Sequence, residues 1–262
     1  MAAGRKKHPR ISSTEDAALR RRIRDVSRAL ERMLGKPKQP PRTPTPLEML
    51  IATILSQNTN DKNSHRAYRS LRTRFPTWKG TATARRSNIV ATIRSGGMAN
   101  QKAQQIQDAL AMVKRRYGRY SLESIRKRTT NTILRELTEI NGVGVKTAAC
   151  VLLFSLKRDV FPVDTHVHRI CTRLALAPNA KTPAETFQQM KGLIPRGRGY
   201  SFHTNLIRFG RRICRSHRPY CGSCPFYRRC SFVGKSERTT ATFNERGTNH
   251  DFMILDNVAG AG

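Results

Sequence analysis

A two-glycine turn joins two predicted apolar helices in the stretch Leu137-Thr138-Glu139-Ile140-Asn141-Gly142-Val143-Gly144-Val145-Lys146-Thr147-Ala148. Glycine permits positive φ angles and close backbone approach. A turn that leads directly into a helix leaves backbone N–H groups at the positive end of the helix dipole, where they suit a phosphate oxygen. The stretch therefore predicts a helix-hairpin-helix over residues 137–157 that grips phosphates without reading sequence. The alternative is a plain connection that needs glycine only for its geometry.

Helical periodicity recurs on both sides of this turn. Apolar residues step by three and four over residues 19–33 and 103–117. Thr45-Pro46-Leu47-Glu48 combines an N-cap, a first-turn proline and a capping-box glutamate, and Thr182-Pro183-Ala184-Glu185 repeats this combination. No segment alternates convincingly with period two. We therefore predict an all-α protein of roughly nine or ten helices.

The charge of the chain indicates a polyanionic partner. Fifty Lys and Arg residues against seventeen Asp and Glu give a formal charge of +33, which is spread along the sequence. This balance is typical of nucleic-acid binding, although charge alone does not choose DNA over RNA. The alternative is a basic protein whose charge only keeps it in solution.

The sequence gives no sign of a membrane protein. No apolar run reaches the length of about 18 residues that a spanning helix needs. The basic start Gly4-Arg5-Lys6-Lys7 is followed by a polar segment, and a signal peptide would have an apolar run there. We expect an intracellular protein, located in the cytoplasm with the nucleoid if the source is prokaryotic.

Four cysteines near the C-terminus predict a metal site. Cys214, Cys221, Cys224 and Cys230 form a C-x6-C-x2-C-x5-C pattern that is interleaved with arginines. In an intracellular chain, this close spacing favours a metal over disulfides. The spacing alone leaves zinc and an iron–sulfur cluster equally open. Cys150 and Cys171, by contrast, lie on apolar helix faces and are expected in the core.

A further motif after the hairpin carries a resemblance to a known family. This motif is Phe161-Pro162-Val163-Asp164-Thr165-His166-Val167-His168-Arg169. The hairpin, this motif and the cysteine pattern, in this order and at this spacing, resemble the endonuclease III family of DNA glycosylases from about Leu47 to Cys230. The resemblance implies double-stranded DNA as the partner, in a groove between two helical domains. It also raises the expectation of a [4Fe-4S] cluster on the four cysteines.

The resemblance also sets the expected boundaries along the chain. A six-helix barrel with the hairpin is expected over 47–159, and a cluster-bearing domain, with the iron–sulfur loop at 214–230, over 160–233. The N-terminal helix and linker at 13–46 are expected to pack with the cluster-bearing domain. Residues 1–12 and 234–262 are polar and lack apolar periodicity, so we expect both ends to be disordered.

Lys146 and Asp164 are the catalytic pair that the resemblance implies. An amine attacks the sugar of a nucleotide only without its proton, whereas free lysine has a pKa of about 10.4. The first turn of a helix disfavours positive charge, which favours a reactive amine and Schiff-base chemistry at Lys146. Asp164 would stabilise positive charge at the sugar. The alternatives are a phosphate contact for Lys146 and a helix cap for Asp164, and capping is compatible with catalysis.

The remaining candidates would contact DNA. Base chemistry requires the nucleotide to leave the stack, and a side chain from Ser56-Gln57-Asn58-Thr59-Asn60-Asp61 would fill the gap. By the resemblance, Asn58 aligns with the gap-filling position and Gln57 precedes it, so both are candidates. The polar cluster could also simply cap a helix and turn the chain. The candidate phosphate-binding residues of the hairpin are Gly142, Val143, Gly144 and Thr147.

These observations predict a monomeric, bifunctional DNA glycosylase and AP lyase of base excision repair. The enzyme would flip out a damaged base, with oxidised pyrimidines favoured by the resemblance, and cleave 3′ to the abasic site. One alternative is a glycosylase specific for mismatched thymine or uracil. Another is a DNA-binding module without catalysis, in which the hairpin and the cluster only grip the duplex.

Overall fold

The computed structural model describes residues 13–38, 40 and 42–240. Its described part is helical and contains no strand, so the prediction of an all-α fold is confirmed. Eleven α-helices occur there, more than the nine or ten expected. The extra helices include α4 (Trp78–Thr83) and α5 (Arg86–Ile93), which are too short to show an apolar stripe in sequence. The N-terminal segment expected to be disordered lies outside the described residues.

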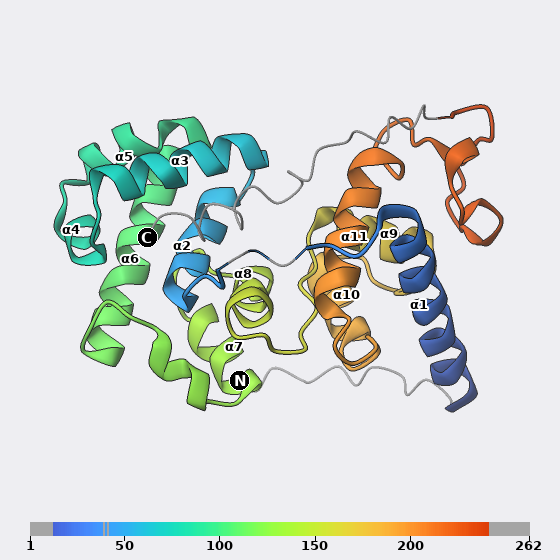
Figure 1. The fold of residues 1–262 in the computed structure, drawn as a ribbon, viewed down its shortest axis with the longest axis horizontal. Helices are drawn as coiled ribbons and strands as arrows, with labels where there is room; N and C mark the ends of the chain where they lie inside the picture. Colours follow the sequence, from blue (N-terminus) through green and yellow to red (C-terminus); the bar gives the residue numbers. More distant parts are fainter. Residues whose placement is uncertain (1–12, 39, 41, 241–262) are drawn as a thin grey trace, which may run out of the picture.

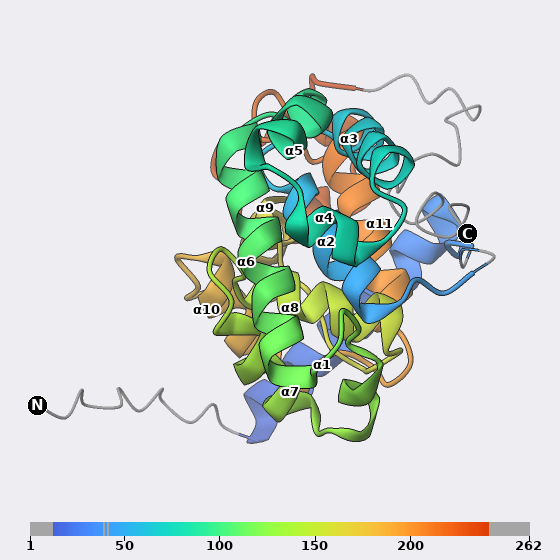
Figure 2. The same cartoon turned by 90° about the vertical axis from the view of Figure 1, so that its left-hand side faces the viewer.

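The first hydrophobic core surrounds α2 (Pro46–Ser56), which is buried along almost its entire length. The predicted capping box is present: the N–H of Glu48 donates to Thr45 Oγ1, and the N–H of Thr45 donates to Glu48 Oε2 at 2.7 Å. A helix that is apolar all round must be buried, and α2 packs against α3 (Asp61–Arg74), α6 (Ala99–Tyr117) and α8 (Val145–Cys150). Outside these, α7 (Thr130–Thr138) packs on α8, α4 on α6, and α5 on α3 and α6 (Figure 2).

The second core lies beside the first (Figure 1) and combines the two ends of the described chain. It contains α9 (Thr165–Arg173), α10 (Pro183–Met190) and α11 (Gly199–Arg212). The N-terminal helix α1 (Ser13–Leu34) packs along α11 and buries Ile23, Val26 and Leu30 against it. None of the described helices is long and apolar enough to cross a membrane.

Aromatic rings join the two cores. Phe154 belongs to the first core, and its ring centroid lies 5.7 Å from those of His203 and Tyr200 on α11. Phe161 of the second core stacks on Phe202 and also contacts His203. Because aromatic rings bury large apolar areas, these contacts hold the two units against each other.

The second helix of the hairpin changes its winding. It begins as α8 and continues as a π-helical turn over Val151–Ser155, with the N–H of Leu156 donating to the carbonyl of Val151 at 3.2 Å. Such turns insert one extra residue into a helix and occur often at functional sites. Here the turn places Phe154 against α11.

Candidate functional site

The two hairpin glycines have different roles. Gly142 has a φ of 77°, and a Cβ added there would lie 2.1 Å from the side-chain nitrogen of Gln105. Gly144 has an ordinary φ of −84°, so of the two hairpin glycines only Gly142 uses a positive φ. A Cβ on Gly144 would meet nothing within 4 Å. The fold therefore requires glycine at 142, whereas at 144 glycine leaves an open backbone surface.

The start of α8 supplies the free backbone donors of the hairpin. The N–H of Val143 is used within the turn, where it donates to the carbonyl of Ile140 at 3.0 Å, and a DNA contact by Val143 stays a prediction. The first-turn N–H groups of Val145, Lys146 and Thr147 have no partner within the helix. Thr147 is a buried residue, and its Oγ1 lies 3.5 Å from Gln57 Nε2.

The structure separates the two candidate gap-filling residues. Gln57 is engaged: its Nε2 donates to the carbonyl of Gly142 at 3.0 Å and lies 3.5 Å from Thr147 Oγ1. Asn58 is exposed, has a left-handed φ of 50° and places its Nδ2 3.6 Å from the sulfur of Met98. Gln57 thus braces the hairpin, and Asn58 is the residue that projects.

Met98 is a neighbour of Asn58 that the sequence did not single out. It is 47% exposed, one of only two large apolar side chains so exposed among the described residues, and its φ is 49°. Nearby, the buried amine of Lys102 donates to the carbonyls of Leu55 and Gly96 at 2.8 and 2.7 Å. Lys102 therefore ties the end of α2, which precedes Asn58, to the turn that carries Met98.

Lys146 and Asp164 line the same cavity, which has a volume of about 540 Å³ and is bordered by α2, α8, α9 and α11. Burial raises the pKa of the Cys150 thiol in its wall, and there Lys146 lowers and Asp164 raises that pKa, so both charges lie within electrostatic reach. No ion pair joins Lys146 to Asp164 among the described residues, although both line the cavity. The apolar residues of the wall are Met49, Cys150, Phe154, Val163, Pro183 and Ile207.

Asp164 is also a helix cap. Its Oδ1 accepts the backbone N–H of Val167 at 2.8 Å, and its backbone is extended as an N-cap requires. Oδ2 has no hydrogen-bond partner among the described residues. One carboxylate oxygen therefore holds α9, and the other is available to the cavity.

Burial lowers the pKa of two histidines of the cavity. Burial lowers the pKa of His203 to about 4, and its Nδ1 lies 2.8 Å from the carbonyl of Pro162, which fixes the proton on Nδ1. Burial also lowers the pKa of His166, whose Nδ1 accepts from Arg169 Nη2 at 3.0 Å. His168 points elsewhere, to Thr186, as its two-residue step from His166 predicts.

An ion pair spans the rim of the cavity. Arg211 on α11 donates to Asp61 Oδ2 on α3 at 2.8 Å, so the pair links the second core to the first. It is partly buried and lies in the same rim as His166. The pair therefore bridges α3 and α11 at the cavity mouth.

The four cysteines of the predicted metal loop are free thiols. Burial raises the pKa of the Cys224 thiol to about 12, and Cys214, Cys230 and Cys221 each raise it further, so the four lie close together. In the described part of the chain, no three side chains of ligand type are arranged to hold a single metal ion. The donor set is all sulfur, which is soft and suits iron–sulfur clusters or zinc.

Basic residues and the following segment hold this loop in place. Arg173 Nη1 donates to Cys214 Sγ at 3.3 Å, and Arg169 donates to the carbonyl of Cys214. Lys235 donates to the carbonyl of Cys230 at 2.8 Å, and the N–H of Gly222 donates to the carbonyl of Thr239 at 2.8 Å. These bonds order residues 235–240, where we expected disorder from 234 onward; the remainder of that tail lies outside the described residues.

Comparison with known proteins places this arrangement in a family. Residues 51–196 match the HhH-GPD superfamily of base excision DNA repair proteins. The chain is 35% identical over 195 residues to endonuclease III of Thermotoga maritima, an alignment that covers 73% of this chain and 87% of that protein. The chain belongs to the endonuclease III family. A second family member, endonuclease III of Synechocystis sp., is 31% identical, over 71% of this chain and 81% of its own length.

A solved endonuclease III structure has the same fold. The structure of a non-covalent endonuclease III–DNA complex superposes with a TM-score of 0.71 at 27% identity, and covers 81% of this chain and 95% of that one. The sequence of this endonuclease III family member pointed to Lys146 and Asp164 as site residues. It did not point to His203, Arg211 or Met98. Their place in the site depends on tertiary packing, and no local motif marks them.

Proposed function

We propose that this chain is a bifunctional DNA glycosylase and AP lyase of base excision repair, acting on double-stranded DNA with damaged bases or abasic sites. The observation that carries the proposal is the cavity that Lys146 and Asp164 share beside the hairpin. A pocket with an amine and a carboxylate, and with apolar walls, suits a base that has left the stack. Oxidised pyrimidines are the proposed substrate class, following the family.

Lys146 is proposed as the nucleophile. Its unprotonated Nζ bonds to C1′ of the sugar as the glycosidic bond breaks, and the base leaves with the bonding electrons and takes up a proton. Opening of the sugar ring gives a Schiff base between C1′ and Nζ. Loss of a proton from C2′ then expels the 3′ phosphate, so strand cleavage follows base removal. A glycosylase without this lysine would only remove the base.

Asp164 is proposed to stabilise positive charge on the sugar. Its Oδ1 is used by Val167, while Oδ2 has no described hydrogen-bond partner and so can face the substrate. A fixed negative charge beside a cationic transition state lowers the barrier most where water is excluded. The neutral His203 and the apolar wall provide such surroundings.

Asn58 is proposed to fill the space that the flipped nucleotide leaves, with Met98 beside it. Asn58 projects from the end of α2, whereas Gln57 is bonded to the hairpin. An exposed apolar side chain such as Met98 can wedge between base steps. The hairpin would meanwhile hold a phosphate on the first-turn N–H groups of α8 beside Gly144.

Cys214, Cys221, Cys224 and Cys230 are proposed to hold a [4Fe-4S] cluster. When bound, the cluster would supply cross-links that shape the arginine-rich loop for phosphate contact. Four free thiols that lie close together without an oxygen or nitrogen ligand fit this group. We expect purified protein to be brown and to lose its visible absorbance in Cys221→Ala, whereas a colourless protein loaded with zinc would exclude the cluster.

Borohydride trapping tests the catalytic proposal. Borohydride reduces a Schiff base to a stable amine, so the parent should form a covalent adduct with duplex DNA that contains an abasic or oxidised site. Lys146→Ala should form none, while Lys127→Ala, which changes an exposed lysine outside the cavity, should trap like the parent. The absence of an adduct from the parent would refute the lyase proposal.

A further inference from the structure

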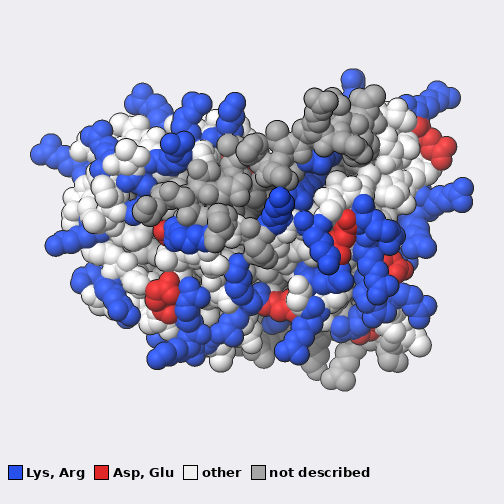
Figure 3. All heavy atoms as spheres, in the orientation of Figure 1, with Lys and Arg blue, Asp and Glu red and all other residues white. Residues whose placement is uncertain are grey.

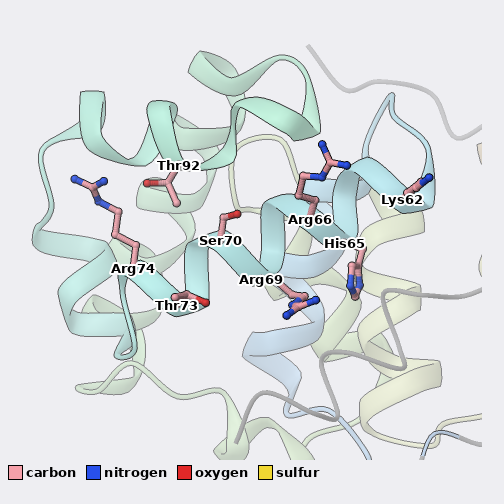
Figure 4. A pocket seen from close by; sticks show the side chains of 8 residues that line it. All are labelled: Lys62, His65, Arg66, Arg69, Ser70, Thr73, Arg74 and Thr92. Carbon is pink, nitrogen blue, oxygen red and sulfur yellow. The ribbon is translucent and has the colours of Figure 1, made fainter.

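A second hollow, of about 810 Å³, lies between α3 and α5 (Figure 4). Its lining contains four Lys and Arg side chains and no carboxylate, and Thr92 faces it from α5 across the side chains of α3. Neither the catalytic proposal nor the hairpin uses this surface. The lining residues are Lys62, His65, Arg66, Arg69, Ser70, Thr73, Arg74 and Thr92.

Three of these cations form a row along α3, which we call the α3 stripe: Lys62, Arg66 and Arg69. Their steps of four and three residues place them on one face of the helix, and all three are exposed. At a rise of 1.5 Å per residue, the row is about 10 Å long. Along one DNA strand, phosphates recur about every 3.4 Å of helix axis, so the stripe spans about three of them.

The stripe carries positive charge that the protein does not balance. Within the described residues, none of its three cations forms an ion pair or a hydrogen bond. Arg72 on the same helix differs: it stacks on Trp78 at 4.1 Å and donates to the carbonyls of Phe75 and Pro76. Like charges three and four residues apart disfavour a helix, so the stripe works against the stability of α3.

The stripe begins at the rim of the catalytic cavity. Lys62 lines both the second hollow and a smaller one beside it, in which Asp61, His166 and Arg211 also take part. Those three residues line the catalytic cavity as well. A hollowed surface therefore runs from Lys146 and Asp164, past Lys62, along α3.

We propose that the α3 stripe is a second DNA-binding surface, which holds the phosphate backbone of DNA outside the segment gripped by the hairpin. Its charge complements a polyanion, Arg and Lys are the side chains that contact phosphates, and Ser70 and Thr73 add hydroxyl donors. Its continuity with the catalytic cavity selects DNA as that polyanion. To this extent the inference rests on the proposed function, but it concerns binding alone.

The test uses Arg66→Gln/Arg69→Gln and a matched control, Arg21→Gln/Arg24→Gln on α1. Both pairs are exposed, three residues apart on a helix, and remove the same charge. Binding of the full-length proteins to a long undamaged duplex is measured at several salt concentrations. Each lost phosphate contact reduces the slope of log affinity against log salt by about 0.9, so we expect the α3 variant to lose about 1.8.

The control variant should keep the slope of the parent. Equal slopes in the two variants would overturn the proposal, because the change in salt dependence would then follow from the lower net charge and not from the position of the arginines. Trapping on a short abasic duplex at saturating enzyme should be unchanged in the α3 variant. Loss of trapping there would also overturn it, since the arginines would then serve the catalytic cavity. If the parent formed no trapped adduct, only the lyase proposal would be affected, because the salt dependence of binding to undamaged duplex does not require catalysis.

Discussion

Asp164 combines a structural and a proposed chemical role in one carboxylate. Its Oδ1 caps α9, so any substitution that removes the oxygen also loosens the helix on which the cavity depends. Asparagine offers the same capping oxygen without the negative charge. The two roles can therefore be separated by comparing two substitutions at one position.

We expect Asp164→Asn to keep the stability of the parent and Asp164→Ala to lose about 1 kcal/mol. Both should slow base excision by about 100-fold or more, because the charge beside the sugar is gone in both. Urea unfolding and single-turnover excision measure the two quantities. If Asp164→Asn excised at the parental rate, the residue would be a cap only.

Lys102 is a buried lysine from which we expect a dependence of stability on pH. It is 2% exposed, and burial lowers its pKa to about 8 from an ordinary 10.5. Between these values the unfolded chain holds the proton and the folded chain does not, so stability increases as the pH rises through this window. A neutral amine still has two N–H groups for the carbonyls of Leu55 and Gly96.

We expect the parent to gain stability between about pH 7 and about pH 9.5 by an amount that Lys102→Met does not. Urea unfolding of both proteins at the two pH values isolates this residue, since all other titrating groups are common to both. An identical pH response in the two proteins would show that the amine titrates as it does in the unfolded chain.

At the scale of the element, the two glycines of the hairpin differ in why glycine is needed. Gly142→Ala would place a Cβ against Gln105 at a φ of 77°, so we expect a loss of about 1–3 kcal/mol in the free energy of unfolding.

In Gly144→Ala, by contrast, the added Cβ meets no atom within 4 Å and φ is ordinary, so this variant should fold like the parent. It should nevertheless weaken binding to undamaged duplex, since its Cβ would stand where a phosphate approaches. Thermal unfolding and anisotropy titration separate these effects; unchanged binding by Gly144→Ala would place the phosphate elsewhere.

Elements with local signals could be predicted from the sequence, and elements defined by packing could not. Capping signals at Thr45 and Asp164 depend on residues three apart, and both caps are present. The short helices α4 and α5 lack a periodic stripe, and the π-helical turn after α8 has no sequence signature. Which of Gln57 and Asn58 projects depends on a bond to a turn 85 residues away.

The residues of the site also divide into those that a local motif marks and those that only packing brings there. Lys146 and the four cysteines stand in motifs, so their positions could be recognised although their roles stay predictions. His203 and Arg211 lie on a helix whose apolar pattern gives no sign of a cavity. They enter the site because α11, a helix of the second core, contacts the π-helical turn of the first core beside the cavity. Met98 is marked by its exposure and its left-handed backbone, and both are properties of the folded chain.

At the scale of the whole molecule, the charge that serves DNA binding opposes folding. Fifty cations face seventeen carboxylates, and Lys and Arg side chains cover much of the visible surface, including the region of α3 and α5 (Figure 3). Repulsion among them acts over about 30 Å at 0.01 M salt but only about 8 Å at 0.15 M. We therefore expect the melting temperature of the parent to rise with salt over this range, which thermal unfolding measures. A fall would mean that surface ion pairs outweigh the net repulsion.

The α3 stripe should be the place where this opposition is strongest. Arg66→Gln/Arg69→Gln relieves three like-charged pairs at a spacing of three or four residues, Lys62–Arg66, Arg66–Arg69 and Arg69–Arg72, each worth about 0.2–0.5 kcal/mol. We expect this variant to be more stable than the parent at low salt, by an amount that shrinks as salt is added. Arg21→Gln/Arg24→Gln should gain less, because it relieves the pairs of Arg24 with Arg20, Arg21 and Arg28 but also loses the favourable pair of Arg21 with Asp25 four residues on. An equal gain in stability in both variants would mean that the charge of the stripe is no more unfavourable than that of the rest of the surface. A larger gain on α3 would mean that the stripe lowers stability, a cost that DNA binding by the stripe explains.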